Sequence, residues 1–346
     1  MRIGIPTEVK TAEKRVALTP EACATLVEKG HVVYLQKGAG IGAGFSDDDY
    51  TSVGVKIQPT ADQLFEAAEM VVKVKEPQKE ELSRLRKDHL LFCYLHLAAE
   101  PELTKGLQDI GLKAVAFETV EEGGKTPLLA PMSAVAGRLS VQIGTWYLHA
   151  PRGGRGELMG GIDGLQQGHV VVIGAGVAGQ EAAHLAYHMG AKVTLLDINQ
   201  ERLDMMAQRY PGMHCEISTP ERITELMPET SLLVGSVYVI GKRAPHVVTE
   251  DQVKLMPQGS VIVDISIDQG GCIATSRPCT HDMPVYTQHG VIHSAITNLP
   301  GSVPLTSSKA LSQAILPFVH QLAEGEWTPA LEKGINVDGG ELKIAL

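Results

Sequence analysis

The sequence predicts an α/β protein of two doubly wound parallel-sheet domains, joined by long helices with a cleft between them. Three observations support this fold class. The 346 residues are enough for two domains, since one domain usually holds ~150 residues. Apolar, β-rich runs alternate with helical patterns in both halves of the chain. Residues 169–197 contain a strand, a glycine turn, a helix and a second strand in that order, as in a βαβ unit.

The first half of the chain has enough alternating elements for one sheet, and the second half continues the βαβ unit with further strands. Each β-rich run of the first half is followed by a helical pattern, which is the order that produces parallel strands with helical crossovers. In the first half we expect strands at residues 2–5, 31–35, 70–74, 90–95 and 113–117, and helices at residues 20–29, 61–67, 80–86 and 101–107. In the second half we expect strands near residues 232–234, 261–265 and 291–293.

Two longer helical patterns join these halves. Residues 131–149 follow a proline entry and carry an apolar stripe at helical spacing. Residues 307–322 form the second pattern, with a kink expected at Pro317, and lead the chain back to the first sheet. The predicted domains are therefore residues 1–128 with 306–346, and residues 129–305.

The glycine turn of the βαβ unit has the residue types that a bound pyrophosphate requires. Residues 170–173 are all β-branched, as in a strand buried on both faces. Gly174 permits a tight turn, Gly176 lets the backbone approach a phosphate, and Gly179 lets the next helix pack on the strand. The N-terminal amides of that helix point toward the phosphates. The alternative is a βαβ turn without a ligand, which the complete pattern disfavours. We therefore expect a Rossmann dinucleotide-binding domain.

The residue that ends the second strand of the unit indicates which dinucleotide binds. Asp197 stands where a carboxylate accepts hydrogen bonds from the adenine ribose and repels a 2′-phosphate. NAD is therefore favoured over NADP. Arg202 lies close enough in the sequence to attract a 2′-phosphate, so NADP stays the alternative.

The composition excludes several other classes of protein. The net charge of -10 argues against a nucleic-acid or anionic-membrane surface. Five cysteines without CxxC spacing are typical of reduced thiols in a cytoplasmic protein. We find no secretory signal and no apolar run of the ~18 residues that a membrane span needs. His184 and His188 lack the glutamate of an HExxH motif and a third ligand, so we expect no metal.

Four polar residues follow predicted strands and are candidates for chemistry. Arg15, Lys75 and His96 come after strands of the first half, and ligands of open parallel sheets bind beyond such strand ends. Arginine and lysine can hold a substrate carboxylate, and histidine can transfer a proton near neutral pH. Asp268 follows a strand of the second half, beside the expected nicotinamide position. The alternatives are solvated loop residues for Arg15 and Lys75 and a hydrogen-bonded structural group for His96. For Asp268 the alternative is a turn residue.

Several segments together resemble bacterial L-alanine dehydrogenase over nearly the whole chain. The segments are RIGIPTEVK, EKRVALTP, VKVKEP, LHLAA, PLLAPMSAVAGRLS, VVVIGAGVAG, DISIDQGG and NLPGSVPLTSS. The resemblance implies a cytoplasmic homo-oligomer, commonly a hexamer, that converts L-alanine, water and NAD to pyruvate, ammonium and NADH, and also catalyses the reverse reaction.

The resemblance also assigns residues to roles. It implies that Arg15 and Lys75 bind the substrate, that His96 is the general acid/base, and that Asp268 acts beside it. For the cofactor it implies, besides the glycine turn, Ser133, Val177, Ala178, Asp197, Arg202, Ser218, Val237, Tyr238, Ile265, Ser266, Ile267, Asp268, Arg277, Ile296, Thr297, Asn298 and Leu299.

Two other functions are compatible with a dinucleotide-binding chain. The nucleotide-binding subunit of a proton-translocating transhydrogenase is similar in the first strand, the RVA loop and the glycine turn. Those relatives generally lack the residues found here as Lys75, His96 and Asp268. A non-catalytic NAD-binding protein would need none of these three residues. Their presence favours an autonomous enzyme.

Overall fold

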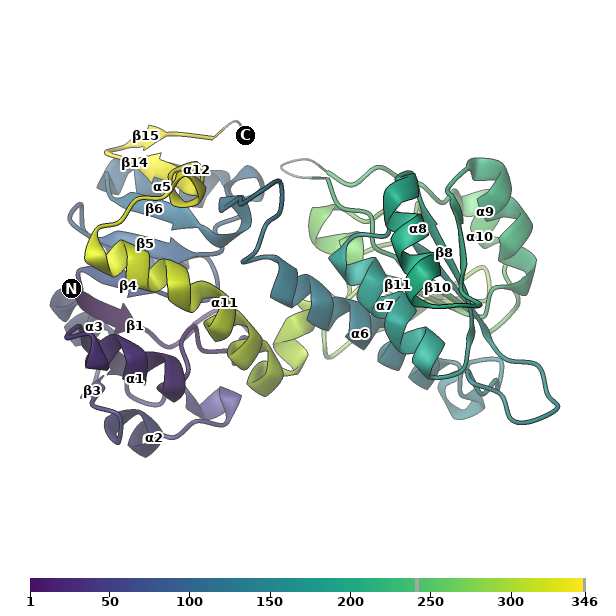
Figure 1. The fold of residues 1–346 in the computed structure, drawn as a ribbon, viewed down its shortest axis with the longest axis horizontal. Helices are drawn as coiled ribbons and strands as arrows, with labels where there is room; N and C mark the ends of the chain where they lie inside the picture. Colours follow the sequence, from purple (N-terminus) through teal and green to yellow (C-terminus); the bar gives the residue numbers. More distant parts are fainter. Residues whose placement is uncertain (240–242, 345–346) are drawn as a thin grey trace. The chain divides into compact units, whose positions relative to one another are not determined.

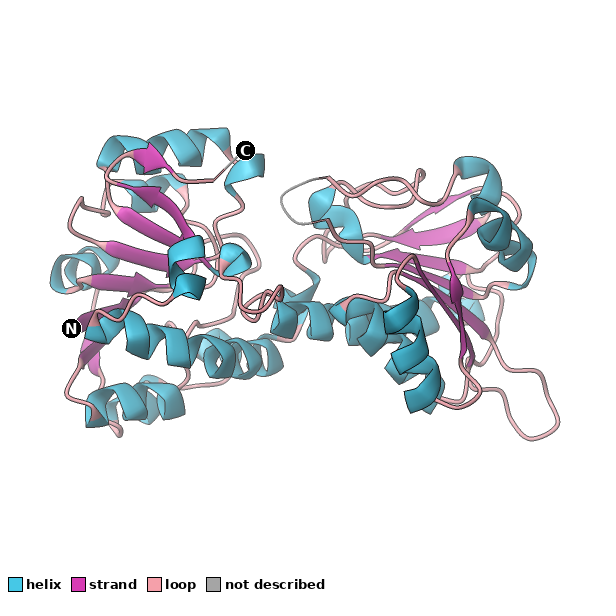
Figure 2. Cartoon of the chain, turned by 45° about the horizontal axis from the view of Figure 1, so that its top comes forward, coloured by secondary structure: helices cyan, strands magenta, loops and turns pink. Residues whose placement is uncertain are grey.

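The computed structural model describes residues 1–239 and 243–344. It divides the chain into two compact units: unit 1 is Met1–Met132 with Val303–Leu346, and unit 2 is Ser133–Ser302. The unit boundaries lie a few residues from the expected ones. Each unit contains a mostly parallel sheet with helices packed around it (Figures 1 and 2), so the predicted α/β class with two sheets is confirmed.

The sheet of unit 1 has eight strands in the order β15-β14-β6-β5-β4-β1-β2-β3. Its strands are β1 (Arg2–Ile5), β2 (Val32–Gln36), β3 (Lys56–Gln58), β4 (Met70–Val72), β5 (Leu90–Cys93), β6 (Lys113–Ala116), β14 (Ile335–Asp338) and β15 (Glu341–Leu342). Its helices are α1 (Pro20–Glu28), α2 (Asp47–Thr51), α3 (Ala61–Ala67), α4 (Lys79–Leu82), α5 (Pro101–Ile110), α11 (Pro304–Glu324) and α12 (Pro329–Lys333). Strands β1 to β6 are all parallel, so their carboxyl ends share one edge.

The sheet of unit 2 has seven strands in the order β12-β13-β11-β10-β7-β8-β9. Its strands are β7 (His169–Ile173), β8 (Lys192–Asp197), β9 (His214–Ile217), β10 (Leu232–Gly235), β11 (Val261–Asp264), β12 (Tyr286–Gln288) and β13 (Val291–Ser294). Its helices are α7 (Val177–His188), α8 (Gln200–Arg209), α9 (Pro220–Leu226) and α10 (Glu250–Val253), and α6 (Ala130–Tyr147) crosses the boundary from unit 1. The chain order reverses between β7 and β10, which is where dinucleotides bind in doubly wound sheets.

An antiparallel hairpin at one edge of each sheet was not predicted. β14 pairs antiparallel with β6 and β15, and β12 pairs antiparallel with β13. The turn from β14 to β15 is Gly339-Gly340, and the turn from β12 to β13 is His289-Gly290, all four with positive φ. Two-residue hairpin turns favour this backbone conformation. The two Gly-containing pairs were therefore the sequence signals that could have revealed both hairpins.

Two other expectations for unit 1 differ from the structure. The helix expected at residues 80–86 is the single-turn α4, and the short edge strand β3 was not expected. α4 has four residues and β3 has three, so both are too short to show an extended apolar pattern. The expected helix with Pro317 is α11, which continues through that proline.

Helix α6 crosses the beginning of α7 at backbone contact distance. A Cβ built on Gly137 of α6 would lie 2.1 Å from the carbonyl oxygen of Ala178. Any side chain at position 137 would therefore push α6 away from the glycine turn. Gly144, farther along α6, lies against the side chain of Leu232 in β10, and a Cβ at position 144 would lie 2.4 Å from its Cδ1. Two glycines thus let α6 pack closely on α7 and β10.

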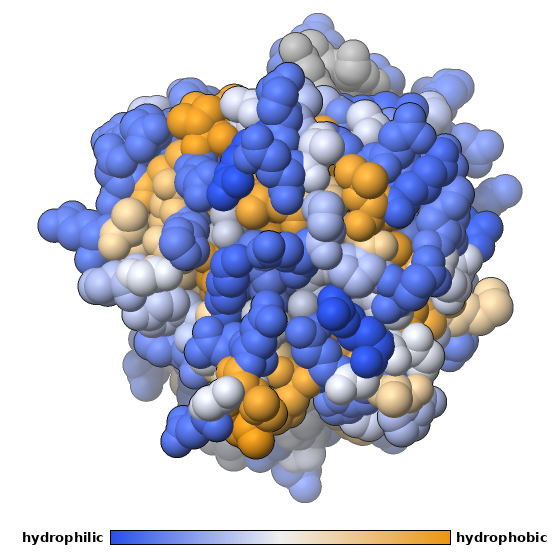
Figure 3. Space-filling view, turned by 90° about the vertical axis from the view of Figure 1, so that its right-hand side faces the viewer, coloured by the Kyte–Doolittle hydropathy of each residue, from blue (hydrophilic) through white to orange (hydrophobic). Residues whose placement is uncertain are grey.

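The face of the molecule shown in Figure 3 is mostly hydrophilic, with hydrophobic side chains in scattered patches. Within residues 1–239 and 243–344, no helix is both long and apolar enough to cross a membrane. The apolar side chains of the strands instead form the cores of the two units.

Candidate active site

The carboxyl edge of the unit 1 sheet carries three of the predicted site residues. Arg15 lies in the loop after β1, Lys75 follows β4, and His96 follows β5. Strand β4 lies between β1 and β5, so these three loops are neighbours. Two hydroxyls of α11 hold the loop of Arg15, because Ser308 and Ser312 accept hydrogen bonds from its backbone at 3.0 Å. The structure therefore brings the three residues to one edge.

Arg15 is a buried, paired cation and not a solvated loop residue. Its side chain is 2% exposed and that of Glu13 is fully buried. The guanidinium donates to both carboxylate oxygens of Glu13, from Nε at 2.7 Å and from Nη2 at 2.5 Å. Nη1 lies 3.1 Å from the sulfur of Met132. Burial lowers the pKa of Arg15, but the hydrogen bonds and charge of Glu13 raise it overall, so the arginine stays charged.

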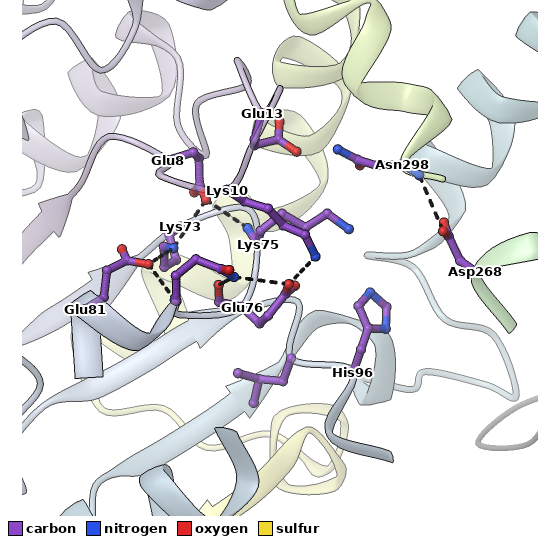
Figure 4. Close-up of polar contacts among 12 residues, drawn as sticks. Glu8, Lys10, Glu13, Lys73, Lys75, Glu76, Glu81, His96, Asp268 and Asn298 are labelled. Carbon is purple, nitrogen blue, oxygen red and sulfur yellow. Dashed lines mark hydrogen bonds and ion pairs between the residues drawn. The ribbon is translucent and has the colours of Figure 1, made fainter. Parts of the chain in front are cut away.

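A buried carboxylate, that of Glu8, also holds the backbone at Lys75. Glu8 accepts hydrogen bonds from the amides of Val74 at 2.5 Å and Lys75 at 3.3 Å, and so fixes the backbone after β4 (Figure 4). The ammonium of Lys73, only 1% exposed, lies 3.3 Å from Glu8 and 2.8 Å from Glu81. Burial raises the pKa of Glu8, and Lys73 opposes this rise. The network places Lys75 where its side chain extends beyond the strand ends.

His96 has a strained backbone that a third carboxylate supports. Its φ of 49° and ψ of 39° are left-handed, a conformation that costs about 1 kcal/mol or more for a residue with a Cβ. Glu118 accepts hydrogen bonds from the amides of Leu95 at 3.1 Å and His96 at 2.6 Å. The same carboxylate lies 3.8 Å from Nδ1 of His96, and the ring stacks on Tyr94 with centroids 5.7 Å apart. These contacts leave the imidazole 44% exposed and in a defined orientation.

The three carboxylates Glu8, Glu13 and Glu118 were missed by sequence analysis. In the sequence they are glutamates in polar loops, which usually indicate solvated positions. Their burial follows from the packing of the loops after β1, β4, β5 and β6 at one edge of the sheet. The spacing of Glu13 two residues before Arg15 was the only local signal.

The glycine turn of unit 2 has the shape that a dinucleotide pyrophosphate requires. Gly174 has a φ of 103°, which favours glycine. A Cβ on Gly179 would lie 1.7 Å from the carbonyl oxygen of Gly174, so α7 packs directly on the turn. A Cβ on Gly176 would meet no atom within 4 Å, so there is open space where a phosphate would approach. The cradle therefore fits a dinucleotide.

Asp197 has a structural role in addition to the one predicted. Its carboxylate accepts hydrogen bonds from the amide of Ala175 in the glycine turn and from Asn199, the latter at 2.8 Å. The residue is 7% exposed. Arg202, in the first turn of α8, is exposed and forms no side-chain hydrogen bond or ion pair within the described residues. Asp197 therefore helps to hold the backbone of the glycine turn in place through the amide of Ala175.

The other predicted cofactor residues fall mostly in loops at the carboxyl edge of the unit 2 sheet. Ser133 lies in the first turn of α6, one turn before the Gly137 contact with α7. The remaining positions follow strand ends: Val177 and Ala178 after β7, Ser218 after β9, Val237 and Tyr238 after β10, Ile265, Ser266 and Ile267 after β11, and Ile296, Thr297, Asn298 and Leu299 after β13.

Arg277 lies between β11 and β12, in a loop that pairs with the segment after β13. The amide of Cys279 donates to the carbonyl of Ala295, which places this loop alongside Ile296. The Arg277 guanidinium lies over the ring of Tyr286, 4.0 Å from its centroid. The side chain is exposed but has this aromatic partner.

Asp268 lies on the 3₁₀ helix η6 (Ile265–Gln269), directly after β11. Its side chain is exposed, and one carboxylate oxygen accepts a long hydrogen bond of 3.4 Å from the amide of Asn298 (Figure 4). Asn298 has a left-handed φ of 56°. The carboxylate is thus available for chemistry at the end of a short, tightly turned segment.

The fold and these sites define a two-domain α/β dehydrogenase. Family models described as Alanine dehydrogenase/PNT match residues 4–136 for the N-terminal domain and 140–344 for the C-terminal domain. The chain belongs to the alanine dehydrogenase/PNT family, and it is an enzyme.

Individual relatives cover almost the whole chain. Alanine dehydrogenase of Halomonas elongata is 47% identical over 351 residues, covering 99% of this chain and 94% of the relative. Alanine dehydrogenase of Bacillus subtilis is 45% identical over 350 residues, covering 99% of this chain and 92% of the relative. A solved L-alanine dehydrogenase has a TM-score of 0.95 at 46% identity, covering 99% of this chain and 97% of that one. A transhydrogenase from Sinorhizobium meliloti, at 22% identity and a TM-score of 0.85, shares the fold.

Proposed function

We propose that this enzyme catalyses the NAD-dependent oxidative deamination of L-alanine to pyruvate and ammonium, and the reverse reductive amination. The observation that carries the proposal is the placement of Arg15, Lys75 and His96 at one sheet edge, each backed by a buried glutamate. Such fixed cations and a fixed imidazole suit an amino-acid substrate. Sequence identity of 43–47% to several alanine dehydrogenases supports alanine as that amino acid.

In this proposal the basic residues bind and orient the substrate. Nε and Nη2 of Arg15 are bonded to Glu13, so the remaining N–H groups of Nη1 and Nη2 bind the substrate carboxylate. Lys75 contacts the oxo group of pyruvate and stabilises the negative charge on that oxygen as ammonia attacks and the α-carbon becomes tetrahedral. Glu13 fixes the side chain of Arg15 and Glu8 fixes the backbone of Lys75 before the substrate binds. Little conformational freedom of these residues is therefore lost on binding.

NAD is proposed to bind unit 2 at the glycine turn. The amides at the beginning of α7 bind the pyrophosphate, and Asp197 accepts from the adenine ribose. The open space at Gly176 and the tight turn at Gly174 support this assignment. When bound, the nicotinamide supplies the chemistry of accepting a hydride from the α-carbon of alanine. The remaining predicted residues of the strand-end loops, from Ser133 to Leu299, are proposed to line this site.

His96 is the proposed general acid and base. After oxidation of the substrate to an iminium, the imidazole takes a proton from the water that attacks the α-carbon. It then returns a proton to the nitrogen as ammonia leaves and pyruvate forms. Its 44% exposure lets it exchange protons with solvent between turnovers. Asp268 is proposed to assist these proton transfers as a second carboxylate.

The same proposal includes the biological setting. We infer a cytoplasmic homo-oligomer, commonly a hexamer in this family, with L-alanine, pyruvate and ammonium as small-molecule partners. The net charge of -10 supports the absence of nucleic-acid and membrane partners. Analytical ultracentrifugation of the purified protein tests the oligomeric state.

The decisive experiment measures NADH formation by the purified protein with a panel of L-amino acids. We expect activity with L-alanine and NAD, and pyruvate-dependent NADH oxidation only when ammonium is present. Activity with no amino acid would refute the proposal and favour a transhydrogenase subunit or a non-catalytic NAD-binding protein. Activity with another amino acid and none with alanine would refute the substrate assignment alone.

A further inference from the structure

Asp264, the last residue of β11, is a buried carboxylate to which the reaction above assigns no role. It is 1% exposed. One oxygen accepts a hydrogen bond from the amide of Ser266 at 3.0 Å. The other oxygen accepts from the amides of Cys272 at 2.9 Å and Ile273 at 3.2 Å. A single carboxylate therefore joins the beginning and the end of the loop that follows β11.

This loop contains Asp268, whose side-chain contacts do little to fix the conformation of the loop. Helix η6 has only five residues, and so short a 3₁₀ segment is not stable without outside contacts. The Asp268 side chain is exposed, and its hydrogen bond with Asn298 is 3.4 Å long (Figure 4). The direction in which Asp268 points is therefore set by the backbone of η6. Asp264 holds that backbone at both ends, together with the hydrogen bond from Ser266 Oγ to the carbonyl of Val237 at 2.8 Å and that from the amide of Gly271 to the carbonyl of Ser266 at 3.0 Å.

The space around Asp264 admits no other acidic side chain. A Cβ on Gly271 would lie 2.9 Å from one carboxylate oxygen, and a Cβ on Gly235 would lie 3.3 Å from the other. Two glycines thus let the backbone approach the carboxylate on both sides. A longer glutamate would have to displace this backbone. An asparagine would fit, but its NH₂ group would face amide donors that need an acceptor.

We propose that Asp264 is a positioning residue that fixes the loop after β11 so that Asp268 is held in its reactive orientation. This inference rests on the proposed function, since it assumes that Asp268 takes part in the reaction. It adds a fourth buried carboxylate to Glu8, Glu13 and Glu118, each of which holds a functional residue through backbone or side-chain donors.

A double-mutant cycle on kcat tests the inference. The variants are Asp264→Asn, Asp268→Asn and the double variant, assayed with saturating alanine and NAD. If Asp264 acts through Asp268, Asp264→Asn lowers kcat by at least about tenfold, and the double variant stays within about twofold of Asp268→Asn. Val263→Ala, a core truncation of the preceding residue of β11, is the control for lost stability and should leave kcat nearly unchanged.

Hydrogen exchange provides a second readout that does not depend on the chemistry of Asp268. In Asp264→Asn, the amides of Ser266, Cys272 and Ile273 should exchange at least about tenfold faster, while those of β10 stay protected. In Val263→Ala, the three loop amides should keep their protection relative to the strand.

The possible outcomes separate this inference from the proposed function. Unchanged loop exchange in Asp264→Asn would overturn the inference, as would effects on kcat that multiply in the double variant. If Asp268→Asn alone has normal kcat, the proposed role of Asp268 is wrong, and the inference that Asp264 orients it for reaction falls with it. Alanine-dependent NADH formation by the unaltered enzyme would still support the proposed function.

Discussion

Replacement of Glu13 by glutamine should raise KM for the substrate without changing the affinity for the cofactor. The glutamine oxygen can keep the hydrogen bonds from the amide and Nε of Arg15, which measure 3.0 and 2.7 Å. In the unaltered enzyme Nη2 of Arg15 donates to the other carboxylate oxygen at 2.5 Å. In the variant this nitrogen faces the NH₂ group of the glutamine, which cannot accept a hydrogen bond. One charge-assisted hydrogen bond is lost, and both side chains are too buried for water to replace it.

The size of the effect follows from that one bond. A buried hydrogen bond to a charged group contributes about 1.5–3 kcal/mol. For a domain of about 150–250 residues this lowers Tm by about 3–12 °C. If the loosened guanidinium also loses about 1 kcal/mol of its interaction with the substrate carboxylate, KM for alanine and pyruvate rises about fivefold. The change in kcat should be smaller, because the carboxylate interaction is similar in the bound substrate and the transition state.

Steady-state kinetics in both directions and NADH binding by fluorescence test this prediction. NADH affinity should stay constant, because Glu13 belongs to unit 1 and the glycine turn to unit 2. Tyr50→Phe is a matched control: this buried hydroxyl donates to the carbonyl of Leu18 in the same loop at 2.8 Å. The control should lower Tm and leave KM unchanged. A Glu13→Gln enzyme with lowered Tm but unaltered KM values would show that Glu13 only stabilises the fold.

Three further predictions concern the proposed site. His96→Ala should lower kcat by about 10²–10⁴, with NADH affinity retained in a fluorescence titration; a loss below tenfold, or lost NADH binding, contradicts the role. Asp197→Ser should raise the ratio of kcat/KM for NADP to that for NAD, because Arg202 remains to attract the 2′-phosphate, and should also lower NAD affinity, because the Ala175 amide loses its acceptor; an unchanged ratio would show that Asp197 does not face the ribose. Arg15→Lys should raise KM several-fold with little change in kcat, whereas Lys75→Ala should lower kcat strongly; equal KM values before and after the arginine change would refute substrate binding by Arg15.

Much of the fold could be predicted from local sequence patterns. The βαβ unit of β7, α7 and β8 is evident because each of its parts requires a particular residue type at a fixed spacing. The edge strands were missed because they are short and have a weak hydrophobic pattern: β15 has two residues and β3 has three. A strand of that length is defined by the neighbour with which it pairs, so its sequence carries little signal.

The residues of the candidate site, like the elements of the fold, could be predicted from the sequence only in part. The sequence by itself determined which side chains follow strand ends, because parallel strands place all such loops at one edge of a sheet. It therefore predicted Arg15, Lys75, His96 and Asp268 as candidates. It could not distinguish a solvated charge from a buried one, since the same glutamate suits a polar loop in either case.

Only the tertiary structure decided that Glu8, Glu13, Glu118 and Asp264 are buried and bonded to the segments that carry those four residues. The physical reason is that burial of a carboxylate is stable only where several donors converge on it. For Glu8 and Glu118 the donors lie in a neighbouring strand-end loop, tens of residues away in the chain. Glu13 and Asp264 accept from donors of their own loops, which fold back onto them.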